Sequence, residues 1–493
     1  MTDTQSFALQ VLFVAGVGLL AVLSNRLSER IKVPTPALFL AGAALAVHFF
    51  PRLHSPSLPL VEQLVTVALV CILFDGGMHI GWTRFRVAAA PIVVVGVLGT
   101  FLTVGAAALF VHLALGLSWY VSLLVATAVA PTDPAVVFSV LGQREVAGRS
   151  GTILEGESGA NDPVGIALMA SLIAAGGLGP GAVGHIVGEF ALEMGVGAAV
   201  GVAGGLALVW FMRSVSLPSE GLYPLRTLMC AFVLYGLATV AHGSGFLAVF
   251  VAGILVGDVR APFKREVERF HSALASLGEI VAFGVLGLTL DLSILARTDV
   301  WVPGLVLGAV VAFVIRPVLV GLCLIPADLA RNERGFILFA GLKGAVPILL
   351  GSFVLATHID QAARLYGIIV VVVAFSVLVQ GTFLPSVASL LRLPMRTVAP
   401  EPWALGVRLR DEPDGVHRMV VEAGSPADGH TIDTLTDLPE DVWVCFVVRD
   451  RGLLAVRRDT TLQVGDEVLV LADPELHADI VAAFRDPTAN RVD

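Results

Sequence analysis

Two short acidic segments carry the side chains of this sequence that are best suited to binding a proton or a cation. The first reads Ala-Pro-Thr-Asp-Pro-Ala at residues 130–135, and the second reads Glu-Gly-Glu-Ser-Gly-Ala-Asn-Asp-Pro at residues 155–163. Both lie inside or beside long apolar runs, where an ionised side chain is costly and is a functional candidate by default. A carboxylate in such a place can hold either a proton or a cation.

The first segment is expected to interrupt a helix. Pro131 and Pro134 bracket Thr132 and Asp133, and a helix cannot continue unbroken through two such closely spaced prolines. An aspartate followed by a proline is typical of a helix N-cap and first turn. A half-helix should therefore restart here, with the positive end of its dipole at membrane depth.

The second segment is expected to form a helix with a polar seam. Glu155, Ser158 and Asp162 are spaced i, i+3 and i+7, which places them on one helical face. Glu157 and Asn161 are spaced i, i+4 and form a neighbouring stripe. The seam therefore brings three carboxylates, a hydroxyl and an amide together on one side of the helix.

We predict that Asp162 is the group that proton and cation share. Proton-coupled cation transport needs a carboxylate among neutral oxygen ligands near a water-accessible midplane. The hydroxyls of Thr132 and Ser158 are expected to join Asp162 around a monovalent cation, while Asp133 adds charge across the site. Competition of the two ions for one carboxylate would couple their movements. The alternative for both aspartates is a helix cap, because a proline follows each of them.

Two basic residues within apolar runs are predicted to be structural. Arg316 is the one arginine deep in any predicted span, and an unpaired arginine in hydrocarbon is expensive. We therefore expect an ion pair between Arg316 and Glu157. Lys343 lies in a second polar interruption, where compensation of helix dipoles is a better explanation than ligation.

The composition is that of a polytopic membrane protein. The chain has 493 residues, of which 56% are hydrophobic and 14% charged. The net charge is -9, and the sequence contains no block of basic residues that would suggest a nucleic-acid partner. The N-terminus lacks the basic start of a signal peptide, so the first apolar run is expected to be a retained span. The four cysteines, Cys71, Cys230, Cys323 and Cys445, are widely separated and do not have the spacing of a metal site or a redox motif. We therefore expect no cofactor.

Thirteen apolar runs have roughly the length of a membrane span. A count of twelve is the alternative, because the second and ninth runs are short. With thirteen spans and an outside N-terminus, seventeen basic residues fall in the loops expected to be cytoplasmic and three in the opposite loops. The runs fall near residues 7–24, 35–50, 60–80, 88–115, 118–141, 157–177, 185–212, 223–242, 245–257, 273–293, 300–325, 334–357 and 364–391.

A second broken span is predicted at residues 340–347, which read Ala-Gly-Leu-Lys-Gly-Ala-Val-Pro within an apolar run. The two breaks fall in the fifth and twelfth runs, seven apart, so the two halves would insert with opposite orientations. This pattern predicts an all-α fold of about thirteen transmembrane helices with inverted repeats and two discontinuous helices, as in secondary transporters.

The composition changes after Pro394, and a small cytosolic α+β domain is expected there. Residues 441–448 and 453–456 alternate like strands around a turn at 450–452, residues 464–472 form another strand, and 474–485 a closing helix. We therefore divide the chain into a transmembrane exchanger domain, residues 1–394, and a cytosolic regulatory domain, residues 395–493, with its core at about 404–486.

The motifs at residues 132–134, 157–162 and 341–345 resemble the monovalent cation/proton antiporter superfamily, in the branch that carries Asn-Asp in place of paired aspartates. The resemblance implies an electroneutral exchanger, a homodimer, and a dimerisation and a core domain that work by an elevator-like movement. It also implies ion-binding roles for Asp162, Thr132, Asp133 and Ser158 and a structural pair of Glu157 with Arg316. Lys343 departs from the arginine usual in the family's glycine-rich motif, which puts any role of a planar guanidinium in doubt.

Residues 156–163 are similar to the NhaP/CvrA type of potassium/proton antiporters, which are linked to cell-volume regulation. Residues 404–486 resemble the C-terminal subdomain of potassium-conductance regulator (RCK) modules, which implies a regulatory or dimerising tail with a small-molecule ligand left open. No Gly-x-Gly-x-x-Gly unit precedes it, so a nucleotide-binding half is not expected.

Taken together, the sequence predicts a non-enzymatic secondary antiporter of the plasma membrane, with its N-terminus outside and its tail in the cytoplasm. Potassium is favoured over sodium as the ion exchanged for protons, and a sodium/proton antiporter is the first alternative. A regulated cation channel is the alternative from another class, although no Thr-Val-Gly-Tyr-Gly filter occurs. An intramembrane hydrolase using Asp133 and Asp162 lacks any accompanying motif. The expected partners are the lipid bilayer and a second copy of the chain.

Overall fold

The computed structural model describes most of the chain in two compact units, Met1–Pro400 and Glu401–Asp493. The predicted first span, near residues 7–24, falls mostly outside the described residues. Those are 34–49, 57–141, 144–146, 149–357, 359–393, 395–397, 415–435, 442–449, 452–473 and 476–485, with single residues between 5 and 23.

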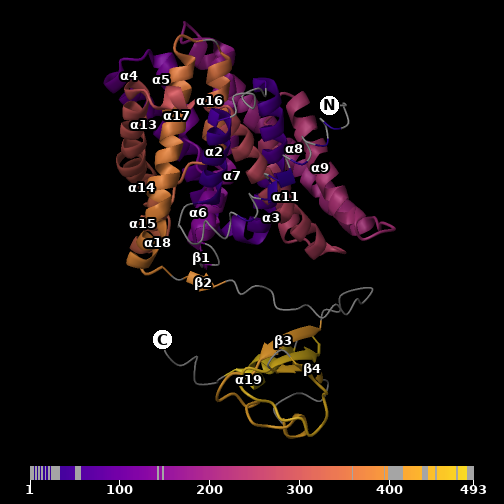
Figure 1. Ribbon diagram of the computed structural model, residues 1–493. Helices are drawn as coiled ribbons and strands as arrows, with labels where there is room; N and C mark the ends of the chain where they lie inside the picture. Colours follow the sequence, from indigo (N-terminus) through magenta and orange to yellow (C-terminus); the bar gives the residue numbers. More distant parts are fainter. Residues whose placement is uncertain are drawn as a thin grey trace. The chain divides into compact units, whose positions relative to one another are not determined.

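The first unit is a bundle of helices (Figure 1). Within the described residues, seven helical stretches are long and apolar enough to cross a membrane, and three shorter apolar helices accompany them. The elements are α2 (Thr35–Phe49), α3 (Leu58–Val93), η2 (Val94–Gly99), α4 (Thr100–Leu115), α5 (Trp119–Val129), α6 (Pro134–Leu141), α7 (Arg149–Ala175), α8 (Ala182–Ser214), α9 (Leu222–Val240), α10 (Gly245–Gly257), α11 (Lys264–Leu288), α12 (Leu292–Leu295), α13 (Thr298–Val310), η3 (Val311–Ile315), α14 (Arg316–Cys323), α15 (Arg331–Phe339), α16 (Ala345–Ala356), α17 (Ala362–Phe375), η4 (Ser376–Gln380) and α18 (Gly381–Leu390).

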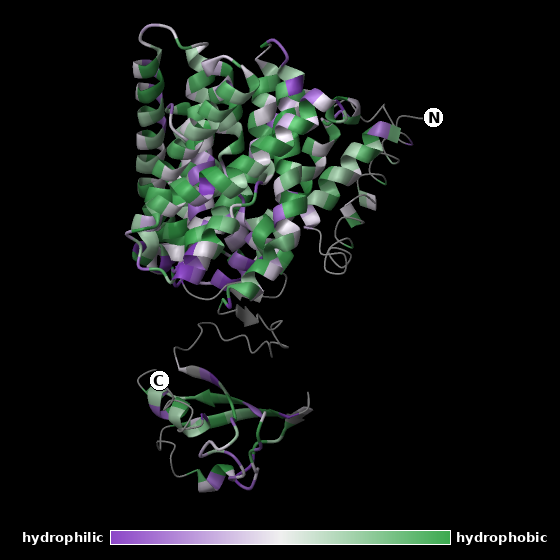
Figure 2. Cartoon of the chain, turned by 90° about the vertical axis from the view of Figure 1, so that its left-hand side faces the viewer, coloured by the Kyte–Doolittle hydropathy of each residue, from purple (hydrophilic) through white to green (hydrophobic). Residues whose placement is uncertain are grey.

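The helices of this unit form two groups with α7 and α16 between them. One group contains α4, α5, α13 to α15, α17 and α18, and the other contains α3 and α8 to α11 (Figure 1). Figure 2 shows hydrophobic residues over most of the helical surface, with hydrophilic residues at helix ends and a small group inside the bundle. The polar residues Thr132, Glu157, Ser158, Asn161, Asp162, Arg316 and Lys343 are buried, because an apolar bilayer is an unfavourable surrounding for them.

Close helix packing depends on small residues, as expected where lipid and protein interior are equally apolar. Gly77 of α3 faces Gly253 of α10, and a Cβ added at Gly253 would lie 2.5 Å from the carbonyl oxygen of Phe74. Backbones can approach this closely only where no side chain intervenes. The α3 and α10 helices therefore pack as one rigid pair.

Gly81 divides α3 into two spans, where the sequence had indicated separate runs at 60–80 and 88–115. Its φ of 63° and ψ of 162° break the helical path, and a φ in this range favours glycine. The carboxylate of Asp258 lies against Gly81 and accepts a hydrogen bond of 2.6 Å from the N–H of Thr83. This bond caps the second half of α3 as it restarts.

Within the part of the chain that the structure describes, three π-helical turns interrupt the long helices, and they were not predicted from the sequence. They are η2 between α3 and α4, η3 between α13 and α14, and η4 between α17 and α18. Such turns cost helical regularity and are frequent at functional sites. A short antiparallel pair was also unexpected: β1 (Arg144–Val146), after α6, pairs with β2 (Met395–Thr397), after α18.

The second unit is a small α+β domain. Its antiparallel sheet has the order β3-β6-β4-β5, formed by β3 (Val416–Val420), β4 (Trp443–Arg449), β5 (Gly452–Leu454) and β6 (Glu467–Leu471). The helix α19 (His477–Phe484) contributes Ile480 and Phe484 to the same core as Val468 and Val470. The expected strands and closing helix are confirmed, the turn residues 450 and 451 lie outside the described residues, and β3 was missed.

A partly buried ion pair connects β4 to the start of β6. Asp466, of which 1% is exposed, accepts hydrogen bonds of 2.8 and 2.7 Å from Arg449 and one of 2.8 Å from the N–H of Gln463. Burial alone would raise the pKa of Asp466, but the bonds from Arg449 and Gln463 outweigh it and hold the pKa below its ordinary value. The stabilisation is present above the unfolded pKa of about 3.9 and is lost as the pH falls through the lower folded pKa.

We expect Asp466→Asn to destabilise the tail domain by about 2 to 3 kcal/mol at neutral pH, because it removes the carboxylate that accepts two charge-assisted hydrogen bonds from Arg449. Hydrogen exchange of the β6 amides in the full-length protein measures this. The neighbouring pair of Arg418 and Glu467 is exposed, so Glu467→Gln is the matched control and should cost less than about 1 kcal/mol. Equal losses in the two variants would contradict the prediction.

Candidate functional site

The two predicted helix breaks meet inside the first unit. One lies between α5 and α6, the other between α15 and α16. The N–H of Asp133 donates a hydrogen bond of 2.8 Å to the carbonyl oxygen of Leu342, and Lys343 Nζ donates one of 2.8 Å to the carbonyl oxygen of Ala130. Each break therefore provides hydrogen-bond partners for backbone groups of the other.

Asp133 occupies the N-cap position that the sequence predicted, and it does so for two half-helices. Its Oδ1 accepts a hydrogen bond of 2.8 Å from the N–H of Ala135 in α6. Its carboxylate also interacts with the backbone N–H groups of Val136 in α6 and Ala345 in α16. One carboxylate thus faces the positive ends of both half-helices, which is a favourable arrangement for an acidic side chain.

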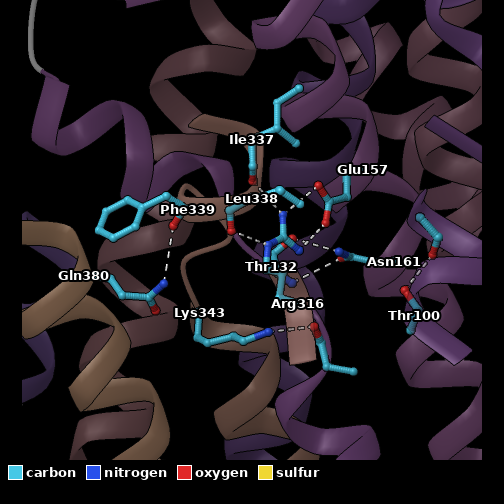
Figure 3. A network of polar contacts seen from close by, with 12 residues as sticks. Thr100, Thr132, Glu157, Asn161, Arg316, Ile337, Leu338, Phe339, Lys343 and Gln380 are labelled. Atoms are coloured by element: carbon cyan, nitrogen blue, oxygen red, sulfur yellow. Dashed lines mark hydrogen bonds and ion pairs between the residues drawn. The ribbon is translucent and has the colours of Figure 1, made fainter. Parts of the chain in front are cut away.

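Lys343 compensates the opposite helix end. Its side chain is 3% exposed, and its ammonium group contacts the carbonyl of Ala130, at the C-terminal end of α5. A cation at a helix C-terminus is favourable. This geometry agrees with the dipole-compensating position expected for Lys343, and the contact is visible in Figure 3.

The polar seam lies on α7 as predicted; Glu155 is half-buried and the other four members are buried. Pro163 lies within this helix and has no N–H, so it leaves the carbonyl of Gly159 without its usual helical partner. That carbonyl oxygen therefore has no partner within the helix, and it was not among the ligands predicted from the sequence. The exposed fractions of the seam residues are 2% for Glu157, 4% for Ser158, 2% for Asn161 and 7% for Asp162.

Asn161 holds the first break against α7. Its Nδ2 donates a hydrogen bond of 2.8 Å to Thr132 Oγ1, and its Oδ1 accepts one of 3.3 Å from the N–H of Thr132. The amide thus uses both of its ends on one residue (Figure 3). Thr132 Oγ1 keeps a lone pair after this bond, so it retains the capacity to bind a cation.

The predicted pair of Glu157 and Arg316 is present. Arg316 Nη1 and Nη2 donate hydrogen bonds of 2.6 and 2.9 Å to the two carboxylate oxygens of Glu157. The same guanidinium also donates to the carbonyls of Leu338 and Ile337, at 3.2 and 3.1 Å. Arg316 therefore donates hydrogen bonds to backbone carbonyls at the C-terminal end of α15 as well as to the buried carboxylate of Glu157 (Figure 3).

Asp162 lies near the place where the two helix breaks meet, which we call the crossing. Its interaction partners differ from those of Glu157 and Asp133. It accepts a hydrogen bond from the side chain of Ser158, and Asp133 and Lys343 lie within electrostatic range. In the described residues around the crossing, Glu157 is matched by an arginine and Asp133 by helix ends. Asp162 differs from both, because the hydrogen bond that it accepts comes from a neutral hydroxyl.

Gly344 of the second break lies against Asp133 of the first, so a substitution there tests how closely the two breaks approach each other. A Cβ added there would overlap Asp133 Oδ2, Cβ and Cγ. We expect Gly344→Ala to push Asp133 away from the N-terminus of α16, at a cost of about 1 to 3 kcal/mol, and to lower any transport by at least tenfold (about 1.4 kcal/mol per factor of ten).

The measurement for Gly344→Ala is ion flux per amount of folded protein in proteoliposomes. Gly335→Ala in α15 is the matched control, because the nearest atom to an added Cβ there is 3.7 Å away. A methyl group is accommodated at that distance, and alanine favours a helix. Full flux in Gly344→Ala would contradict the close approach of the two breaks.

Comparison with known proteins decides the family. Residues 16–390 match the family model described as sodium/hydrogen exchanger, transmembrane, which is more than half of the chain. The chain belongs to the sodium/hydrogen exchanger family. Residues 416–485 of the exchanger match the TrkA-C domain model, a range that begins in β3 and ends just after α19. The resemblances seen in the sequence, for the transmembrane part and the tail, are confirmed.

Several relatives of the exchanger carry names. The K(+)/H(+) antiporter NhaP of Alkalimonas amylolytica is 32% identical over 95% of this chain and 82% of its own. The K(+)/H(+) antiporter NhaP2 of Shewanella oneidensis is 30% identical over 92% of this chain and 79% of its own. The Na(+)/H(+) antiporter ApNhaP of Aphanothece halophytica is 25% identical over 67% and 65%.

A solved structure supports the fold of the exchanger. The sodium proton antiporter MjNhaP1 of Methanocaldococcus jannaschii matches with a TM-score of 0.65 over 78% of this chain and 100% of that one, at 21% identity. At this identity the likeness concerns the fold alone. The predicted fold class, a polytopic helical membrane protein with a small strand-containing tail, is therefore confirmed.

Proposed function

We propose that this exchanger is a secondary active, electroneutral antiporter that moves protons against a monovalent cation, with potassium favoured over sodium. Asp162 is the group that the two ions share, with the hydroxyls of Thr132 and Ser158 as further cation ligands and Asp133 as a fixed charge nearby. Asn161 positions Thr132, while Glu157, Arg316 and Lys343 support the scaffold. The exchanger acts as a transporter with these ions as substrates and requires no cofactor.

The observation that carries this proposal is the distribution of charge around the crossing. Glu157 faces Arg316, Asp133 faces the N-termini of α6 and α16, and Lys343 faces the carbonyl of Ala130. These three charges have fixed protein partners. Asp162 accepts a hydrogen bond from the neutral hydroxyl of Ser158, and the ammonium group of Lys343 nearby is bonded to the carbonyl of Ala130. The charge of Asp162 is therefore best balanced by an ion that arrives from solution.

Electroneutrality follows from one shared carboxylate. When Asp162 binds a proton it is neutral, and when it binds one monovalent cation the pair is neutral as well. The site therefore crosses the membrane with the same net charge in either direction, and the membrane potential does no work on the cycle. An ionised, empty Asp162 would carry a net charge through hydrocarbon, which is unfavourable.

Potassium is favoured because of the relatives. The NhaP and NhaP2 relatives, at 30 to 32% identity over most of the chain, are named potassium/proton antiporters. The sodium/proton antiporter ApNhaP is less similar. Oxygen ligands serve both ions, so cavity size and ligand number distinguish them.

Purified exchanger in proteoliposomes tests the function. Proton movement is followed on adding potassium, sodium or lithium, first with the membrane potential clamped and then with it free. We expect cation-driven proton flux that is largest with potassium and independent of the potential. Larger flux with sodium would favour the sodium/proton alternative, whereas potential-driven cation flux without proton movement would mean a channel.

The setting of the exchanger in the cell forms part of the proposal. We place the N-terminus outside and the TrkA-C tail in the cytoplasm of the plasma membrane, on the basis of the basic residues in alternate loops. The tail, residues 395–493, is proposed to regulate transport by residues 1–394 through a small-molecule ligand. We also propose a homodimer in the bilayer, which crosslinking in native membranes would detect.

A further inference from the structure

The turn η4 places two buried polar side chains against the second break. Ser376 and Gln380 lie at its first and last positions and are each 2% exposed. Both face the loop between α15 and α16, and Figure 3 shows Gln380 directed at the carbonyl of Phe339. Neither residue stood out in the sequence, because both lie in an apolar run without any recognisable motif.

Gln380 completes the hydrogen bonding at the C-terminal end of α15. The carbonyl of Phe336 accepts from the N–H of Ala340 at 2.7 Å, and Arg316 serves the next two carbonyls. Gln380 Nε2 donates to the carbonyl of Phe339 at 3.3 Å. The last carbonyls of a helix have no partner within it, so Gln380 supplies a bond that α15 itself cannot.

Ser376 fixes the direction in which Gln380 points. Its hydroxyl donates a hydrogen bond of 2.9 Å to Gln380 Oε1 and accepts one of 3.0 Å from the N–H of Lys343. Because Oε1 is occupied by the hydroxyl, Nε2 is the end of the amide that faces Phe339. The two side chains therefore hold both ends of the loop, residues 339 and 343.

The loop that they hold forms the contact with the first break. Within it, Leu342 accepts from the N–H of Asp133, and Lys343 Nζ reaches the carbonyl of Ala130. A shift of the loop would move both contacts together. The position of Asp133 relative to Asp162 thus depends on two side chains of η4 that touch neither aspartate in the described contacts.

We propose that Ser376 and Gln380 are positioning residues for ion exchange, which act through the loop 339–343 to align the charges of the two breaks around Asp162. The inference rests on the proposed antiport. It adds α17 and α18, joined by η4, to the elements that determine the site. Loss of either side chain should weaken cation binding rather than merely reduce the amount of folded protein.

The test measures how the exchange rate depends on the cation concentration and on pH, in the full-length native protein and in its variants. Ser376→Ala and Gln380→Leu should each raise the half-saturating cation concentration about tenfold, equivalent to about 1.4 kcal/mol, and shift the pH profile. Ser376→Thr keeps the hydroxyl and should restore values within about twofold of the native protein. The double variant should be no worse than either single one, because both act in one network.

Ser171→Ala is the matched control, because it also removes a buried hydroxyl that bonds a carbonyl, at 2.8 Å from Ala167, away from the break. It should leave both readouts unchanged. Unchanged half-saturation and pH profile in Ser376→Ala and Gln380→Leu, with only less folded protein, would overturn this proposal alone. Absence of exchange in the native protein would overturn the proposed function, and this proposal with it.

Discussion

Replacing Asp162 by asparagine is expected to reduce cation-driven proton flux to the level of protein-free liposomes. Asparagine keeps the shape and the hydrogen bond from Ser158, but it holds neither a proton nor a negative charge at accessible pH. A neutral amide cannot alternate between two ions. Folding should be preserved, because the substitution removes a buried charge that has no fixed cationic partner among its described hydrogen bonds.

The measurement is potassium-driven proton flux at matched protein density, with a thermal unfolding midpoint recorded for each variant. Glu193→Gln is the matched control, because it removes a carboxylate on α8, away from the crossing. It should keep native flux. Asp133→Asn should lose flux less completely, since asparagine is also a good N-cap but does not offset the two helix dipoles.

Robust coupled exchange in Asp162→Asn would contradict the assignment of Asp162 as the shared carboxylate and would favour Asp133 in that role. Loss of flux in both Asp162→Asn and Glu193→Gln would instead indicate a general sensitivity to lost carboxylates. The two substitutions together therefore separate a shared ion site from a generic effect of charge on the protein or on its insertion into liposomes.

Some features of the crossing could be predicted from the types of the residues and their neighbours in the sequence. The succession of Asp133 and Pro134 indicated a cap and a restarted helix, and the structure has both. The pairing of Glu157 with Arg316 followed from the cost of a lone guanidinium in hydrocarbon. In these cases a strong local preference or a large penalty left few arrangements open.

The rest depends on contacts between residues far apart in the chain. Nothing near Asp133 in sequence indicates that its carboxylate also faces the N–H of Ala345, or that Arg316 would satisfy the carbonyls at the end of α15. The π turn that presents Ser376 and Gln380 lies in a plain apolar run. Strand β3 was missed because its partner β6 comes some fifty residues later, and pairing of that kind leaves little local signal.

Replacing Arg316 by methionine is expected to remove most of the folded protein. The guanidinium of Arg316 is 6% exposed and forms a two-pronged contact with Glu157, which is 2% exposed. Breaking a buried pair by removing one partner costs about 3 to 5 kcal/mol. The carbonyls of Leu338 and Ile337 lose their donor as well, at about 1 to 3 kcal/mol for each group left unsatisfied. This total is comparable to the whole stability of a typical domain.

The amount of monodisperse protein extracted from membranes and its thermal midpoint measure this effect. Arg297→Ala serves as a control, because that arginine pairs with Asp299 at an exposed position. Its loss should cost less than about 1 kcal/mol. A well-folded but inactive Arg316→Met protein would contradict the structural role of the pair and move Arg316 into the ion pathway.

A double variant, Glu157→Gln with Arg316→Met, separates the two contributions. It removes the uncompensated carboxylate, so stability should recover above that of Arg316→Met, since replacing a buried pair by neutral groups is often tolerated. Recovery should remain incomplete, because the carbonyls at the end of α15 still lack the donors that Arg316 supplies. Full recovery would mean that capping contributes nothing, and no recovery would mean that the charge of Glu157 is not what makes the single variant unstable.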